Sequence, residues 1–166
     1  MPTLYLIRHA KSSWKDSRLD DLDRPLNSRG ERDAPEMGRR LAARKVSADQ
    51  IITSPALRAK TTAGVIAGAT GFPAERIIFN EDVYLATPTT LLDIICSLDD
   101  AWQSVFIFGH NPGFTQLANM LCNAEIENVP TCGIVAVDFP GKKWVEIPRS
   151  NGKMLFFDFP KNKSDL

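Results

Sequence analysis

The chain has 166 residues, of which 43% are apolar and 24% are charged, values typical of one globular domain with one core. Basic and acidic residues number 20 each, so the net charge gives no reason to expect a nucleic acid or a membrane surface as partner. The N-terminal residues lack a signal-peptide pattern, and no apolar run approaches the ~20 residues that span a membrane. Three dispersed cysteines without a CxxC pair suggest neither a disulfide framework nor a zinc site. We therefore expect one cytoplasmic domain over residues 1–166.

In chain order, strands are expected to alternate with helices until about residue 122. The apolar runs predict strands at 3–7, 50–53, 76–79 and 104–108, and helices at 28–44, 55–69, 88–98 and 112–122. Ser54 and Thr87 each precede a proline and are predicted to be helix N-caps. Two more strands are expected at 134–139 and 154–159. This order predicts an α/β fold, a three-layer α/β/α sandwich with a mostly parallel central sheet and an antiparallel edge strand.

The two histidines of the chain occupy equivalent positions relative to predicted strands. His9 follows the strand 3–7 after Arg8, and His110 follows the strand 104–108 after Gly109. Ligands of such sheets bind beyond the carboxyl ends of the strands, so we expect both imidazoles in one site. Arg58 falls in the first turn of a helix that also follows a strand. Free N–H groups and a guanidinium fork there suit an anion such as phosphate.

These residues resemble the histidine phosphatase superfamily, also called phosphoglycerate mutase-like. Its Arg-His-Gly motif after the first strand is similar to Arg8-His9-Ala10. Three further blocks match in order: Arg24-Pro25-Leu26-Asn27-x-x-Gly30, Ser54-Pro55-x-x-Arg58-Ala59-x-x-Thr62-Ala63 and Gly109-His110-Asn111. The small size and the run from Arg8 to Trp14 look most like the SixA-type phosphohistidine phosphatases. The resemblance implies a phosphatase of phosphoglycerate mutase-like fold that requires neither a metal nor another cofactor.

The resemblance also implies roles for the motif residues. His9 would attack phosphorus as a neutral imidazole and hold the phosphoryl group. Arg8, Arg58 and His110 would grip the phosphate oxygens, and His110 is expected to do so best when it is charged.

Other roles depend on weaker parallels. Ser12 and Lys15 are expected to bind phosphate, and Lys15 stands where the mutases have an asparagine. The general acid of the family commonly follows the third strand, which selects Glu81, with Asp82 as its rival. Trp14 would line the mouth of the site or pack in the core.

The expected substrate depends on what is missing from the chain. The segment 81–91 is short where mutase-like relatives carry an insertion that covers the substrate, which predicts an open site. An open site favours a phosphorylated protein, such as a histidine-phosphotransfer domain, or a generic small phosphomonoester. Two alternatives stay open: a small-molecule phosphomonoesterase or phosphoglycerate mutase-like enzyme, and a non-catalytic phosphate-binding module.

Overall fold

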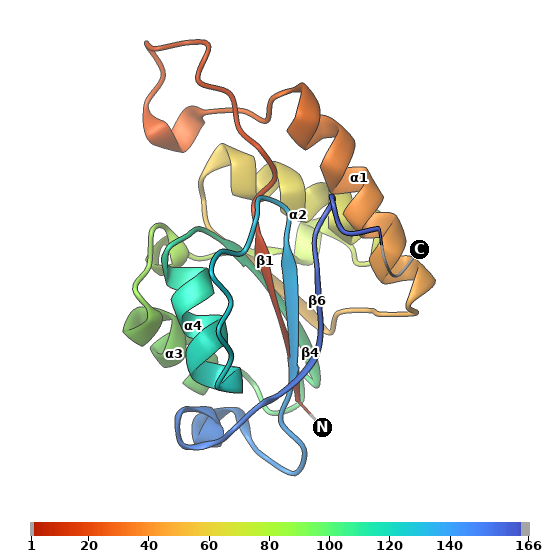
Figure 1. Cartoon of the computed structure of the whole chain (residues 1–166), viewed down its shortest axis with the longest axis vertical. Coiled ribbons are helices and arrows are strands. Elements are labelled where there is room, and N and C mark those ends of the chain that lie inside the picture. The colour runs from red at the N-terminus through yellow and green to blue at the C-terminus, as the bar shows by residue number, and fades with distance from the viewer. Residues whose placement is uncertain (1, 164–166) are drawn as a thin grey trace.

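A six-stranded mixed sheet forms the centre of the computed structural model, which describes residues 2–163 (Figure 1). The strand order is β3-β2-β4-β1-β5-β6. The strands are β1 (Thr3–Arg8), β2 (Gln50–Thr53), β3 (Ile78–Phe79), β4 (Ser104–Gly109), β5 (Ile134–Asp138) and β6 (Lys153–Asp158). Strands β1 to β4 are parallel, whereas β5 pairs antiparallel with β1 and β6 pairs antiparallel with β5. The predicted fold class is confirmed, and its antiparallel edge contains two strands.

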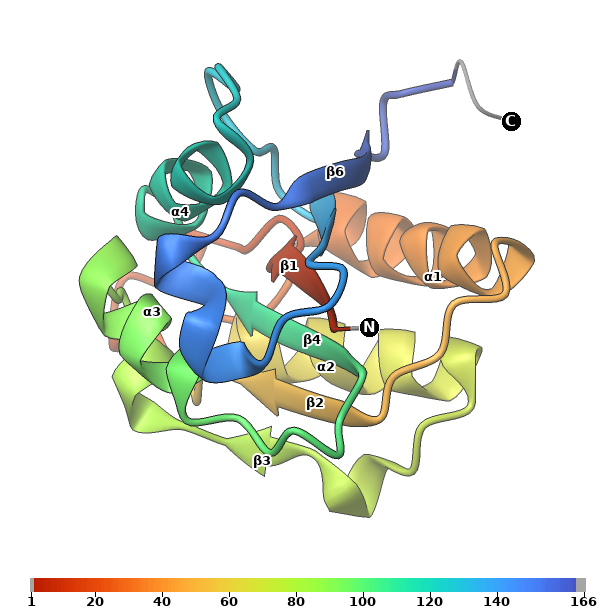
Figure 2. The same cartoon turned by 90° about the horizontal axis from the view of Figure 1, so that it is seen from below.

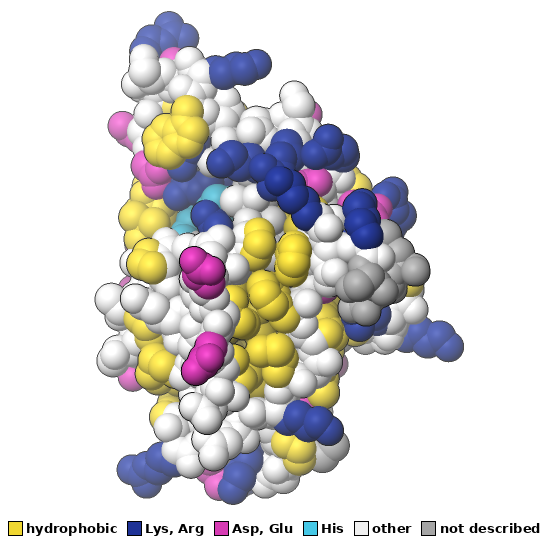
Figure 3. Space-filling model, in the orientation of Figure 1, with side chains coloured by type: hydrophobic (Ala, Val, Ile, Leu, Met, Phe, Trp, Pro, Cys, Tyr) yellow, Lys and Arg dark blue, Asp and Glu magenta, His cyan; other side chains and the backbone are white. Residues whose placement is uncertain are grey.

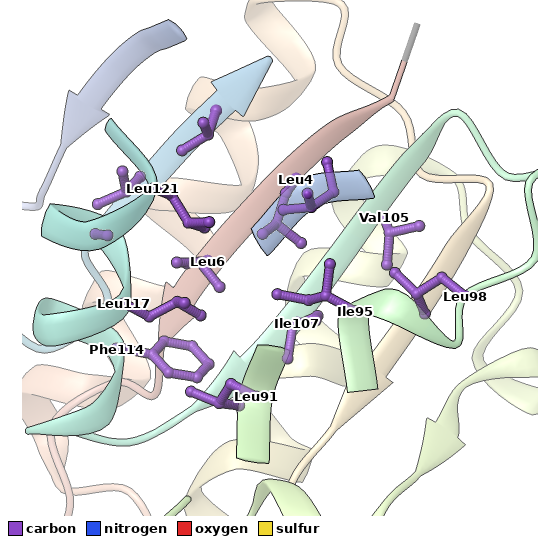
Figure 4. Close-up of a cluster of buried hydrophobic side chains, with 14 of the residues drawn as sticks. Leu4, Leu6, Leu91, Ile95, Leu98, Val105, Ile107, Phe114, Leu117 and Leu121 are labelled. Atoms are coloured by element: carbon purple, nitrogen blue, oxygen red, sulfur yellow. The ribbon is translucent and has the colours of Figure 1, made fainter. Parts of the chain in front are cut away.

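Two pairs of helices cover the two faces of the sheet (Figure 2). One pair is α1 (Ser28–Ala43) and α2 (Leu57–Thr70), and the other is α3 (Pro88–Cys96) and α4 (Gly113–Cys122). Side chains of a strand alternate between faces, so Leu4 and Leu6 enter the core under α3 and α4, while Tyr5 and Ile7 enter the core under α1 and α2. Figure 4 shows the first of these cores. Burial on both faces explains the continuous apolar runs that predicted the central strands.

The predicted helix starts are right for α3 and wrong for α2. The Thr87 side chain caps α3 by accepting the Thr90 N–H, and Pro88 is the first helical residue. Helix α2 begins at Leu57, and Ser54 is not its N-cap. The Ser54 hydroxyl instead bonds to His110, so Ser54 serves the site rather than the helix.

A close backbone contact fixes the long loop after β1. Asn27 caps α1 by accepting the Gly30 N–H at 2.9 Å, and its own N–H donates to the Lys11 carbonyl at 3.0 Å. A Cβ atom at Gly30 would lie 2.1 Å from that carbonyl oxygen, so only glycine fits here. The contact holds the segment between His9 and Asn27 against α1 at the carboxyl edge of the sheet.

Candidate active site

His9 and His110 meet at the carboxyl end of two neighbouring strands. Strands β1 and β4 pair in parallel with Arg8 opposite Gly109, so the next residue of each brings an imidazole to the same place. The ring centroids are 5.2 Å apart, and both side chains are buried. They lie in a cavity of about 390 Å³. Its lining consists of Arg8, His9, Lys11, Ser12, Trp14, Asp21, Arg24, Arg58, Tyr84, Leu85, His110, Asn111 and Thr131.

The surface around this cavity is basic. Figure 3 shows the histidine side chains recessed among several Lys and Arg side chains. Within residues 2–163, the lining contains four basic side chains, Arg8, Lys11, Arg24 and Arg58. In the same range it contains one acidic side chain, that of Asp21. The chain as a whole has no net charge, so its basic groups are concentrated locally in a way that favours an anionic ligand.

The hydrogen bonds of His9 leave its Nε2 atom free to attack. Its Nδ1 atom lies 2.8 Å from the Ala10 carbonyl oxygen, which can only accept, so Nδ1 carries the proton and Nε2 the lone pair. Burial lowers the pKa of His9 to about 4, aided by Arg58 and Arg8 and opposed by the Ala10 hydrogen bond. The imidazole is therefore neutral at pH 7, the form that a nucleophile requires.

His110 is also neutral in this structure, whereas it is expected to hold phosphate best when it is charged. Its Nε2 atom lies 2.7 Å from Ser54 Oγ, and its Nδ1 atom lies 3.4 Å from the Arg58 Nη2 atom, which can only donate. The proton therefore lies on Nε2. Burial, together with His9 and Arg58, lowers the pKa of His110 to about 3. A bound phosphate would act in the opposite direction, because its negative charge favours the imidazolium.

Arg8 and Arg58 bring unpaired donors to this cavity. Arg58 is 3% exposed and donates to the main-chain and carboxylate oxygens of Asp21 at 2.7 and 2.9 Å. Arg8 donates from Nη1 to the Val129 carbonyl at 3.0 Å. Within residues 2–163, the Nε atoms of these two arginines are the buried side-chain nitrogens or oxygens that lack a hydrogen-bond partner. A buried donor without a partner costs free energy, and phosphate oxygens would satisfy both.

Among the polar lining residues to which sequence reasoning gave no role, Asp21, Arg24 and Tyr84 form one hydrogen-bonded network. Arg24 donates from Nε to Asp21 Oδ1 at 3.1 Å and from Nη1 to Ser12 Oγ at 2.8 Å, and the Tyr84 hydroxyl donates to Asp21 Oδ2. Burial acts to raise the pKa of Asp21, but hydrogen bonds from Tyr84 and Arg58 outweigh it and lower the pKa to about 2. Asp21 is therefore an ionised acceptor at the centre of this network. The Arg24-Pro25-Leu26-Asn27 block signalled Arg24, whereas nothing in the local sequence signalled Asp21 or Tyr84.

The structure does not bring Glu81, Asp82 or Lys15 to the cavity, which corrects three expectations. All three are exposed, and Glu81 lines a neighbouring cavity of about 520 Å³ while Asp82 lines another. Strand β3 has only two residues, and the short 3-10 helix η3 (Glu81–Val83) begins after Asn80 and leaves Glu81 and Asp82 exposed to solvent.

Ser12 and Trp14 do line the cavity, each in contact with Arg24. The Ser12 hydroxyl accepts a hydrogen bond from Arg24, so that acceptor role is already taken. The Arg24 guanidinium lies 3.5 Å from the centroid of the Trp14 ring, which is 73% exposed. Trp14 therefore lies at the mouth of the site, the first of its two predicted places.

Comparison with known proteins decides the family. A profile of the histidine phosphatase superfamily (branch 1) matches residues 4–80. An uncharacterized chloroplastic protein of Arabidopsis thaliana is 33% identical over 152 residues, which cover 86% of this chain and 69% of that protein. The chain belongs to the histidine phosphatase superfamily.

Solved structures specify the type of histidine phosphatase. A crystal structure from Agrobacterium tumefaciens, assigned as the phosphohistidine phosphatase SixA, is 27% identical with a TM-score of 0.82 and covers 96% of this chain and 98% of that one. The protein histidine phosphatase SixA complexed with tungstate is 20% identical and shares the fold, with a TM-score of 0.80 over 95% of this chain and 97% of that one. This histidine phosphatase therefore has the SixA-type fold and is a phosphatase.

Proposed function

We propose that the enzyme is a metal-independent phosphohistidine phosphatase that carries the phosphoryl group on His9 Nε2. The observation that carries this proposal is the neutral His9 imidazole beside the orphaned Nε donors of Arg8 and Arg58. Phosphoryl transfer depends mainly on in-line positioning and on stabilisation of the oxygen charges. His9 supplies the nucleophile, and the two arginines with His110 supply the stabilisation.

The proton on His9 Nδ1 supports both chemical steps. When Nε2 attacks phosphorus, Nδ1 keeps its proton and continues to donate it to the Ala10 carbonyl oxygen. The phosphorylated ring is therefore an imidazolium. When water then attacks phosphorus, the electron pair of the P–N bond returns to Nε2, and His9 leaves as a neutral imidazole. The water protons stay with the phosphate or pass to solvent. Neither step needs a metal ion, and within residues 2–163 no three His, Cys, Asp or Glu side chains are grouped to hold one.

The acid–base properties of the lining support phosphohistidine as the substrate. Asp21 has a pKa of about 2, so it cannot donate a proton at neutral pH, and Glu81 and Asp82 lie outside the cavity. An alkyl phosphate needs a proton as its alkoxide leaves. Phosphohistidine that is protonated on its other ring nitrogen leaves as neutral imidazole without one. The pocket thus suits a phosphoramidate better than a sugar phosphate.

The mouth of the cavity supports a protein as the carrier of the phosphoryl group. Trp14 and Leu85 line the cavity and are 73% and 56% exposed. Leu22 and Leu57, also exposed, line the neighbouring cavity, which shares Tyr84 with the first. Large apolar side chains around a charged pocket are typical of protein-binding surfaces. We therefore include a phosphorylated protein, such as a histidine-phosphotransfer domain in signal transduction, in the proposal.

We also propose that the protein is a single domain located in the cytoplasm. Cys96, Cys122 and Cys132 are free thiols, which supports a reducing compartment such as the cytoplasm. Among residues 2–163, no helix is long and apolar enough to cross a membrane. The two cores lie on opposite faces of one sheet, which supports a single domain for residues 1–166.

The experiment compares the wild type with His9→Ala on a phosphohistidine protein and on 4-nitrophenyl phosphate, both in excess chelator. We expect the wild type to release phosphate from both, with an acid-labile phosphoenzyme on His9, and the variant to lose at least about 10³-fold of the activity. Glu81→Gln, a change of an exposed carboxyl, should stay within about 2-fold. Full activity of His9→Ala, or loss of activity in chelator, would contradict the mechanism.

The same assay separates the alternative functions. Hydrolysis of 4-nitrophenyl phosphate without any hydrolysis of phosphohistidine would indicate a small-molecule phosphomonoesterase. Transfer of phosphate between positions of a phosphoglycerate would indicate a mutase-like enzyme. Tungstate binding without turnover of either substrate would indicate a phosphate-binding module.

A further inference from the structure

Asp21 places a negative charge inside a pocket that is otherwise built for an anion. Its Oδ2 atom accepts hydrogen bonds from Arg58 and Tyr84, and its Oδ1 atom accepts one from Arg24. The side chain is nevertheless 40% exposed and lines the same cavity as His9. A carboxylate oxygen has two acceptor directions, so Oδ1 keeps one for a further donor.

A carboxylate beside a phosphate site weakens the binding of a dianion. Like charges a few ångströms apart at a protein surface repel each other. The arginines could be held by neutral acceptors instead, as Arg58 Nη1 is held by the Asp21 main-chain oxygen at 2.7 Å. The carboxylate pairs with Arg24 and Arg58, and its negative charge also offers a place for a cationic group of the substrate.

We propose that Asp21 is a specificity-determining residue that accepts a hydrogen bond from the protonated, non-phosphorylated ring nitrogen of a substrate phosphohistidine. This inference rests on the proposed function and names the part of the substrate that the pocket selects. The ring of such a substrate is an imidazolium, so it brings a positive charge and an N–H donor to the site. Asp21 offers a negative charge and an acceptor at the edge of the cavity, beside the Tyr84 and His110 rings, which are in edge contact at 5.4 Å.

The bond changes of the first step balance with this arrangement. His9 Nε2 forms a bond to phosphorus, and the electron pair of the substrate P–N bond moves to the departing nitrogen. The other ring nitrogen of the substrate keeps its proton and donates a hydrogen bond to the Asp21 carboxylate. The leaving group is therefore a neutral imidazole. Without that proton it would leave as an imidazolate, a far poorer leaving group. Asp21 thus favours the reactive form of the substrate without giving or taking a proton.

A competing explanation is that Asp21 only orders Arg24 and Arg58. The two explanations differ in their dependence on the leaving group. 4-Nitrophenyl phosphate needs the arginines equally but leaves as an anion and offers no N–H donor. Phosphohistidine needs the arginines and the cation acceptor. A comparison of the two substrates in one variant therefore isolates the second role.

The experiment measures kcat/KM of the wild type, Asp21→Asn and Asp23→Asn with free phosphohistidine and with 4-nitrophenyl phosphate at pH 7. Asp21→Asn keeps the size and one acceptor of the side chain and removes its charge. We expect it to lower kcat/KM for phosphohistidine about 10-fold more than kcat/KM for 4-nitrophenyl phosphate, as for the loss of a charged hydrogen bond. Asp23 is an exposed carboxylate of the same short helix and lies outside this cavity, so Asp23→Asn should change the ratio less than about 2-fold.

A pH profile gives a second readout, which a purely structural role would not change. The titratable or charged groups that face Asp21 are Arg24, Arg58, Tyr84 and His110. We expect the alkaline limb of kcat for phosphohistidine to move to lower pH in Asp21→Asn, because the bound imidazolium then loses its proton more easily. An equal loss on both substrates with an unmoved limb would overturn the inference and leave the proposed function intact. A wild type without activity on phosphohistidine would overturn both.

Discussion

Ser54 offers a sharp test of how the neutral His110 holds a phosphate oxygen. Ser54 is fully buried, and its Oγ atom lies 2.7 Å from His110 Nε2 and accepts the Ala56 N–H at 3.2 Å. To donate to phosphate, His110 needs a proton on Nδ1. The Ser54 hydroxyl can reverse its role and donate to Nε2, which allows the Nδ1–H tautomer without a net charge. Ser54 thereby positions a proton on the phosphate side of a ring whose pKa is about 3.

Ser54→Ala removes the hydrogen-bond partner of His110 Nε2, and the His110 side chain is only 3% exposed. A buried polar atom left without a hydrogen bond costs about 1–3 kcal/mol, which corresponds to a loss of about 5- to 150-fold. Because His110 would contact the phosphate oxygens in the bound anion and in the transition state, the loss should be shared by both. We expect kcat/KM for 4-nitrophenyl phosphate and the affinity for inhibitory tungstate to fall together by a factor in this range at pH 7.

The control is Ser97→Ala, which removes an exposed hydroxyl that donates to the Asp93 carbonyl at 3.0 Å on α3. It should leave both quantities within about 2-fold of the wild type. Thermal unfolding of each variant shows whether the protein remains folded at the assay temperature. A folded Ser54→Ala enzyme with unchanged kcat/KM and unchanged tungstate affinity would refute the role of Ser54.

Two further predictions concern stability. Arg40 is buried and pairs with the buried Asp158 at 3.0 Å, so Arg40→Met should lower the free energy of unfolding by about 3 kcal/mol in urea titrations, whereas the exposed Arg39→Met should cost less than about 0.5. The pKa values of about 4 for His9 and about 3 for His110 lie below the value near 6.5 of the unfolded chain, so only the unfolded chain gains these protons between pH 7 and pH 5. The wild type should therefore lose about 2 kcal/mol per histidine over this interval. An equal loss in a His9→Gln, His110→Gln double variant would contradict that assignment.

The part of the site that lies on regular elements is predictable from the sequence. His9 and His110 each follow a buried strand, and their meeting requires only that β1 and β4 be parallel neighbours, which they are. Arg58 is in the first turn of α2, although that helix begins later than predicted. In each case the strand or helix fixes the direction of the side chain, so a local pattern carries long-range information.

The remaining part of the site depends on contacts that no local pattern encodes. Asp21 and Tyr84 are 63 positions apart and come from segments without periodicity. Their side chains meet only because the loop after β1 is fixed to α1 at Gly30 and because η3 delivers Tyr84 to the same edge of the sheet. Such convergence depends on the packed fold and not on a local pattern in the segments that carry these two residues.

The misplaced general acid connects this local geometry to the choice of substrate. Asn80 donates its N–H to the Thr53 carbonyl, and its side chain accepts the Asp82 N–H, so the chain turns immediately after β3. That turn presents Tyr84 to the cavity and Glu81 to the neighbouring one. The hydrogen bond to Asp21 raises the pKa of Tyr84, so its hydroxyl is a poor acid at neutral pH. Neither side chain is placed to deliver a proton, and this supports our proposal of a substrate whose leaving group departs without one, such as a protonated phosphohistidine.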